Sequence, residues 1–119
     1  MTSIEPDKFT ETNNPALYYQ DMLADHVRME RYRQAINRVI RPGDVVADLG
    51  TGLGVLALMA YQAGAARVYA VDNRPRSLWV AEQIVRANGA ENDVHLVEGD
   101  AREVQLPEPV DVIGGASIQ

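Results

Sequence analysis

Glycine occupies alternate positions in residues 48–54, Asp-Leu-Gly-Thr-Gly-Leu-Gly, directly after a short apolar run. Glycines such as Gly50, Gly52 and Gly54 accept positive φ and let a ligand approach the backbone closely. A helix beginning just after such a loop directs its free N–H groups toward the same place. The segment therefore predicts a site for a polar, partly anionic ligand, although a tight strand-to-helix turn alone would also use these glycines.

Three carboxylates have a chemical role beside this loop. Asp72 ends a second apolar run, 18 residues after Gly54, where a carboxylate accepts both hydroxyl protons of a ribose. Asp100 follows the next apolar run and could accept the exocyclic amine of an adenine. Asp48 lies inside an apolar run, where a charge needs hydrogen bonds, so we expect it to face the ligand or the loop amides. An ordinary turn residue at Asp72 and a carboxylate at Asp48 that only braces the loop are the simpler alternatives. The predicted site also includes the neighbours of these residues: Thr51, Asn73 and Ala101.

Alternating strand and helix patterns must position these residues. Asn14 and Pro15 favour the start of a helix over residues 15–26, and apolar residues at helical spacing predict a second helix over about 29–40. Strands are expected at 45–49, 67–72, 93–98 and 110–113, and further helices at 55–62 and 75–88. This order predicts an α/β, Rossmann-like three-layer sandwich with about four parallel strands and N-terminal helices. The loop, Asp72 and Asp100 would then share the carboxyl edge of the sheet.

The composition narrows the class of protein. We predict a flexible lead-in at residues 1–13 and one domain at 14–119, because the chain is 119 residues long and 46% hydrophobic. A net charge of −6 and a single lysine, Lys8, argue against nucleic acid as a partner. With no membrane-spanning apolar run and no signal peptide, a cytoplasmic location is expected. The sequence has no cysteine, and His26 and His95 show no metal-binding spacing, so no metal is predicted.

Residues 46–54 resemble the first motif of the class I S-adenosylmethionine-dependent methyltransferases. Residues 22–28, 32–36 and 68–72 are similar to protein arginine methyltransferases in particular, and the likeness runs from about residue 18 to 113. The resemblance implies S-adenosyl-L-methionine as cofactor, Arg28 as the residue that binds its carboxylate, and Met22 at the border of the methyl-transfer centre. It also implies protein arginine as methyl acceptor. A planar guanidinium suits a carboxylate, although without the family Arg28 would read as a solvated helix charge and Met22 as core filler.

The sequence departs from this family at two places. The arginine methyltransferases continue past the fourth strand into a loop with two glutamates, whereas no acidic residue follows Ile113 here, and Arg102 stands where the family often has glutamate. We therefore predict a fold truncated after the fourth strand and assign no catalytic residue. A non-catalytic S-adenosylmethionine-binding module or remnant is the main alternative. The fourth strand would be an open edge, which predicts a homodimer or a partner chain beside it.

A dinucleotide-dependent oxidoreductase is a further alternative. Residues 52–57, Gly-Leu-Gly-Val-Leu-Ala, fit the glycine fingerprint with alanine in the last place, and Asp72 would bind the ribose of NAD equally well. That register begins three residues beyond the expected strand end, however, and it leaves Arg28, Asp48 and Asp100 without a role. The methyltransferase interpretation gives a role to more of these residues than the oxidoreductase interpretation does.

Overall fold

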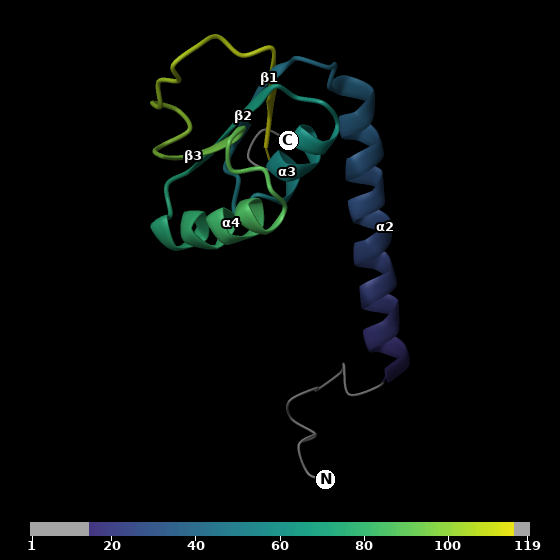
Figure 1. The fold of residues 1–119 in the computed structure, drawn as a ribbon. Helices are drawn as coiled ribbons and strands as arrows, with labels where there is room; N and C mark the ends of the chain where they lie inside the picture. The colour runs from purple at the N-terminus through teal and green to yellow at the C-terminus, as the bar shows by residue number, and fades with distance from the viewer. Residues whose placement is uncertain (1–14, 116–119) are drawn as a thin grey trace. The chain divides into compact units, whose positions relative to one another are not determined.

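The structure, a computed structural model, describes residues 15–115 (Figure 1). The chain falls into two compact units, residues 1–32 and 33–119, and each is described by itself. The predicted lead-in at 1–13 and the predicted helix cap at Asn14 lie outside the described residues. Within residues 15–115, no helix combines the length and the apolar character needed to cross a membrane.

Helix α2, Pro15–Val39, is one continuous helix of 25 residues. The prediction of two separate helices over this range is therefore wrong. No glycine or proline occurs between residues 16 and 41, so nothing in the sequence interrupts the helical hydrogen bonds. The helix ends shortly before Pro42, because the residue before a proline avoids the helical conformation. Ile36 and Ile40, both in the second unit, contribute apolar side chains to its core.

Four parallel strands form the sheet of the second unit: β1 (Val45–Leu49), β2 (Arg67–Asp72), β3 (Val94–Glu98) and β4 (Val112–Gly114). Their order is β3-β2-β1-β4, so the chain moves outward from β1 in one direction and then returns to its other side. The predicted α/β class and parallel sheet are confirmed. Strands β3 and β4 begin one and two residues later than predicted.

Two helices pack on one face of the sheet, α3 (Val55–Gln62) and α4 (Pro75–Ala87) (Figure 1). Alternate strand residues such as Val46, Val68 and Ala70 join Ala57 of α3 and Val85 of α4 in one buried cluster. The small side chains on α3 let the helix lie close to β1 and β2. This packing fixes the start of α3, and with it the glycine loop, against the sheet.

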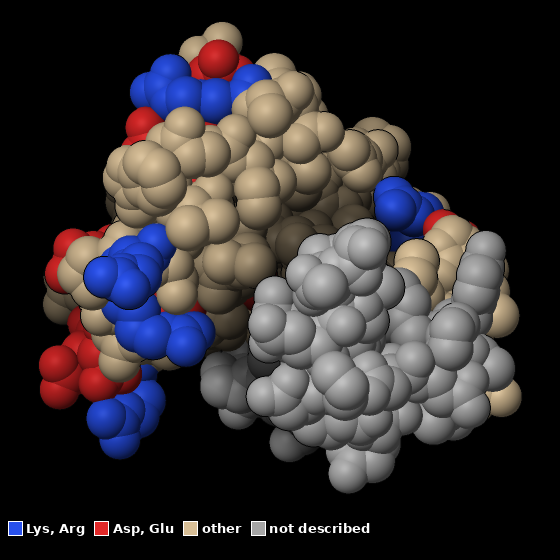
Figure 2. Space-filling view, turned by 90° about the horizontal axis from the view of Figure 1, so that it is seen from below, with Lys and Arg blue, Asp and Glu red and all other residues tan. Residues whose placement is uncertain are grey.

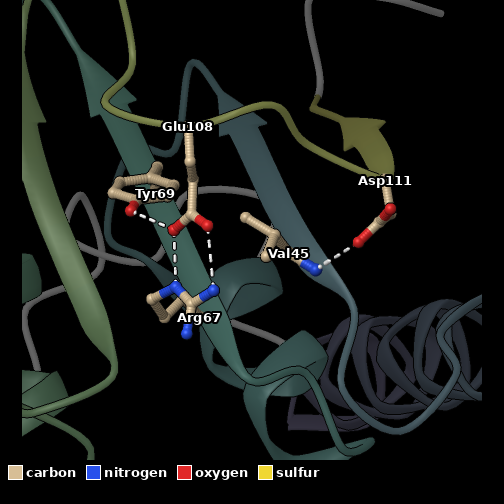
Figure 3. Close-up of polar contacts among 5 residues, drawn as sticks. All are labelled: Val45, Arg67, Tyr69, Glu108 and Asp111. Carbon is tan, nitrogen blue, oxygen red and sulfur yellow. Dashed lines mark hydrogen bonds and ion pairs between the residues drawn. The ribbon is translucent and has the colours of Figure 1, made fainter.

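An irregular segment at residues 99–111 links β3 to β4 and is attached to the first residues of β1 and β2 (Figure 3). Glu108 accepts hydrogen bonds from the Arg67 guanidinium (Nη2 to Oε1, 2.8 Å) and from the Tyr69 hydroxyl (2.6 Å). The Asp111 carboxylate accepts from the backbone N–H of Val45 at 2.9 Å. These contacts hold the last part of the segment, at Glu108 and Asp111, near the amino ends of β1 and β2, whereas its first residues lie at the carboxyl end of β3.

The Glu108 contact predicts an acid-sensitive contribution to stability. Hydrogen bonds from Arg67, and then from Tyr69, lower the pKa of Glu108 to about 2. A lowered pKa in the folded state stabilises the protein above the ordinary glutamate pKa of about 4.3, and this contribution disappears as the pH falls from there toward 2. We expect Glu108→Gln to lower the Tm by a few degrees at pH 7 and to make little difference near pH 2, as followed by circular dichroism.

Glu103→Gln is the control for this prediction, because Glu103 is an exposed carboxylate on the same segment. It removes the same charge without touching Arg67, and its Tm should equal that of the parent at both pH values. An equal Tm for Glu108→Gln at pH 7 would show that the Arg67 contact does not stabilise the fold.

Candidate cofactor site

An open cleft of about 450 Å³ lies at the carboxyl ends of β1, β2 and β3. The sheet order reverses beside β1, and ligands of open α/β sheets bind at such reversals. The cleft is lined by residues that follow each of the three strands: Leu49, Gly50, Asp72, Asn73, Arg74, Gly99, Asp100, Ala101 and Arg102. Five residues of the predicted site are therefore brought together at one place: Gly50, Asp72, Asn73, Asp100 and Ala101.

The glycine loop adopts the conformation that its sequence suggests. Gly50, Gly52 and Gly54 have φ values of 76°, 57° and 82°. The backbone N–H groups of Gly50 and Thr51 both donate to the Val71 carbonyl at 2.8 Å, which ties the loop to the end of β2. At Gly54 the positive φ favours glycine, and a Cβ atom would stand 3.2 Å from the Cβ of Ala81 on α4, a tight contact that would require a small shift of the loop or the helix.

Asp72 is buried at the end of β2, with 3% of its surface exposed. One carboxylate oxygen, Oδ2, accepts from the Gly52 N–H at 2.8 Å. The other, Oδ1, accepts from the Arg74 N–H at 2.9 Å, and the Arg74 guanidinium donates to both oxygens at 3.1 and 3.2 Å. The hydrogen bonds from the Arg74 side chain are the main reason why the pKa of Asp72 is lowered to about 2. The carboxylate is therefore ionised at neutral pH.

Asp100 also lines the cleft, two residues after the end of β3, the strand beside β2, and is bonded in a similar way. Its Oδ1 accepts from the N–H and the Nε of Arg102 at 2.8 and 3.2 Å, and its Oδ2 accepts from the Nη2 of Arg102 at 2.9 Å. The Arg102 side chain lowers the pKa of Asp100 to about 2. Asp100 is thus also an ionised acceptor at neutral pH, and 35% of its side chain is exposed to the cleft and solvent.

Asp48 is buried below the glycine loop and does not line the cleft. Its Oδ2 accepts from the Thr51 hydroxyl at 2.7 Å. Burial raises the pKa of Asp48. Hydrogen bonds from the Thr51 hydroxyl and from the backbone N–H of Ala57 in α3 lower it, but by less. This geometry fits a carboxylate that braces the loop and the start of α3, with Thr51 as its partner.

Arg28 and Met22, the two site residues that rest on the family resemblance, lie on α2 in the first unit. Arg28 pairs with Asp25, one turn earlier on α2, with Nη1 and Oδ1 2.7 Å apart. Half of the Met22 surface is exposed. Their predicted roles at the cofactor remain predictions.

The sequence prediction missed Arg74 and Arg102, although both line the cleft. The spacing of these arginines from the predicted carboxylates in the sequence could have indicated them. In each case an arginine follows the predicted carboxylate by two residues, as Asp-Asn-Arg and as Asp-Ala-Arg. A side chain at that distance can fold back onto the carboxylate that precedes it.

A parallel sheet of this order, a glycine loop after β1 and an acidic residue ending β2 occur in the class I S-adenosylmethionine-dependent methyltransferases and also in dinucleotide-binding folds. A family model described as the TRM5/TYW2 methyltransferase domain matches residues 19–116, and the chain belongs to this family. The predicted class of protein, and S-adenosylmethionine as the cofactor of that class, are confirmed.

Individual relatives agree with this class. Protein arginine N-methyltransferase PRMT10 of Arabidopsis thaliana is 44% identical over 100 residues, which cover 82% of this chain and 26% of the relative. A Trypanosoma brucei PRMT1 enzyme-prozyme heterotetrameric complex with AdoHcy matches with a TM-score of 0.71 and 36% identity over 82% of this chain and 31% of that chain. A complex of aTrm5 and tRNALeu has a TM-score of 0.61 at 23% identity over 68% of this chain and 23% of that chain, a likeness of fold alone.

The chain thus spans about a quarter of the length of the first curated relative that it matches. The similarity to arginine methyltransferases that the sequence predicted is confirmed.

Proposed function

We propose that this chain binds S-adenosylmethionine in the cleft and forms the cofactor-binding part of a protein arginine methyltransferase. The observation that carries the proposal is Asp72, a buried and ionised carboxylate that ends β2, lines the cleft and holds the Gly52 N–H of the glycine loop. A ribose on the same carboxylate would lie directly beside the loop backbone. The names of the relatives supply the methyltransferase chemistry.

Three polar parts of the cofactor have a proposed partner. Asp72 would accept the ribose hydroxyl protons, Asp100 the exocyclic amine of adenine, and Arg28 would pair with the amino-acid carboxylate. Bound S-adenosylmethionine supplies an electrophilic methyl group on a sulfonium. The methyl group would be transferred to a guanidine nitrogen of the acceptor, which would release a proton to solvent, and S-adenosylhomocysteine would be the second product. The Asp72 and Asp100 carboxylates lie on neighbouring strand ends, so one nucleoside could reach both.

Calorimetry with S-adenosylhomocysteine tests the binding step. We expect a saturable heat of binding with a dissociation constant in the micromolar range, about −8 kcal/mol at 1 μM. NADH at the same concentration should not displace the ligand, and displacement would favour the oxidoreductase alternative. The absence of heat with the ligand at about 1 mM, weaker than about −4 kcal/mol, would refute cofactor binding by this chain.

For the methyl acceptor we favour protein arginine over RNA. The chain carries a net charge of −6, and phosphate binding needs clustered basic side chains. On the face in Figure 2, the basic side chains of the described residues form separate groups beside acidic ones, without a continuous basic stripe. Transfer of a labelled methyl group to a histone-like peptide, and not to tRNA, is the expected result. Transfer to tRNA alone would overturn the acceptor, and binding without any transfer would support the non-catalytic alternative.

A partner beside β4 and a cytoplasmic location also remain proposals. Among the described residues β4 is an edge strand, and Ile113 on it is 57% exposed. Edge strands with exposed apolar residues pair readily with another chain. Sedimentation should therefore show a dimer at micromolar concentration, and a monomer throughout would remove the support for self-association.

A further inference from the structure

The two carboxylates proposed to bind the nucleoside are each covered by an arginine of their own turn. Arg74 covers Asp72 and Arg102 covers Asp100, and all four residues line the cleft. The two arginines are the exposed members of these pairs, with 66% and 87% of their side chains accessible. An exposed guanidinium can turn out into water, whereas the Asp72 side chain, 2% exposed, cannot move away.

The hydrogen bonds of Asp72 use its whole accepting capacity. A carboxylate has about four acceptor positions, two on each oxygen. At Oδ1 they are taken by the N–H and the Nε of Arg74, and at Oδ2 by the Gly52 N–H and the Nη2 of Arg74. A ribose therefore finds no free acceptor at Asp72 in this state of the protein.

Only two of these four donors can leave without rebuilding the backbone. The N–H groups of Gly52 and Arg74 are fixed by the glycine loop and by the turn after β2, whereas the Nε and Nη2 groups belong to an exposed side chain. A vicinal diol brings two O–H donors. Two hydrogen bonds from the guanidinium are broken and two from the ribose hydroxyls are formed. All four acceptor positions of the Asp72 carboxylate therefore stay occupied.

We infer that Arg74 is an intramolecular ligand of the ribose subsite, which the cofactor must displace and which thereby sets its affinity. This inference rests on the proposed binding of S-adenosylmethionine at Asp72. The exchange lowers the affinity below that of an unoccupied carboxylate, since the Arg74 pair must be broken for each ligand bound.

Arg102 should contribute much less to this effect. Asp100 accepts three hydrogen bonds, two at Oδ1 and one at Oδ2, so one acceptor position on Oδ2 is unused. The amine of an adenine needs a single acceptor. It can bind Asp100 while Arg102 stays in place.

The test is calorimetry of S-adenosylhomocysteine with Arg74→Ala, with the parent chain and with two matched variants. Arg74→Ala should bind about two- to fivefold more tightly than the parent, as expected for the loss of one partly exposed competing ion pair. Arg102→Ala should change the dissociation constant by less than about twofold. Arg76→Ala, which removes an exposed arginine two residues further along α4, should leave it unchanged.

Salt separates displacement from a general effect on the fold. NaCl weakens the exposed guanidinium pair, so the ratio of the parent and Arg74→Ala dissociation constants should fall toward one as salt is added. Equal or weaker binding by a folded Arg74→Ala variant would overturn the inference, and Arg74→Gln serves if the alanine variant does not fold. If neither the parent nor any variant binds, the proposed function itself fails, so the two failures are distinguishable.

Discussion

Replacing Asp72 with alanine is expected to weaken binding of S-adenosylhomocysteine by about 100-fold or more. The ribose would lose two hydrogen bonds to a charged acceptor, each contributing about 1.5–3 kcal/mol, and tenfold in affinity corresponds to about 1.4 kcal/mol. The Gly52 N–H would also lose its acceptor, so the glycine loop would be held less firmly. Calorimetry measures the loss, and circular dichroism shows whether the fold persists.

Glu98→Ala is the matched control, because Glu98 ends β3 opposite Asp72 in the sheet register, is exposed and does not line the cleft. It should bind as the parent does. Asp72→Asn keeps one carbonyl oxygen as acceptor and should fall between the parent and the alanine variant. A dissociation constant within about threefold of the parent for a folded Asp72→Ala variant, less than about 1 kcal/mol, would show that Asp72 is not the ribose ligand.

Gly115→Ala is expected to destabilise the fold by about 2 kcal/mol or more. Gly115 has a φ of 139°, a backbone conformation that residues other than glycine rarely adopt. An added Cβ would also collide with the carbonyl oxygen of Leu49. Leu49 ends β1 and lines the cleft, so the backbone after β4 cannot retreat without disturbing the β1–β4 pairing. Urea denaturation measures the free energy of unfolding.

Two other glycines separate the causes of this effect. Gly89 has a φ of 69° with nothing within 4 Å of an added Cβ, so Gly89→Ala should show backbone strain alone, about 1 kcal/mol. Gly114 has open space and no positive φ, and Gly114→Ala should be nearly neutral. If Gly115→Ala were no more destabilising than Gly89→Ala, the close approach to Leu49 would not constrain the fold.

The elements from β1 to α4 were predictable because local signals mark their ends. Glycine precedes α3, Pro75 begins α4, and the apolar runs between them have the length of buried strands. The prediction divided the N-terminal helix in two because its apolar periodicity weakens near residue 27. The helix is continuous because no helix-breaking residue interrupts it. Strand β4 begins after Asp111, whose carboxylate binds Val45 across 66 residues, and local sequence cannot show such a contact.

The cleft was predictable to the extent that strand ends determine it. Asp72 and Asp100 follow neighbouring parallel strands, so they had to share one edge of the sheet. The direction in which a long side chain points, in contrast, does not follow from the positions of the strand ends. Arg74 and Arg102 fold back onto these carboxylates because each carboxylate is the nearest negatively charged acceptor, and the sequence alone does not determine the rotamer of an exposed arginine. Asp48 was predicted to face either the ligand or the loop, and its bond to Thr51 favours the loop.

The position of β1 between β2 and β4 has a consequence for how the chain folds as it leaves the ribosome. Strand β1 is the first strand made, yet one of its edges stays unpaired until β4, the last described strand, has been synthesised. The joining contact between Asp111 and Val45 closes a loop of 66 residues. Such distant pairings form slowly, and an open apolar edge attracts other unfinished chains. During that interval the unpaired edge of β1 is therefore the part of the sheet most open to pairing with another unfinished chain.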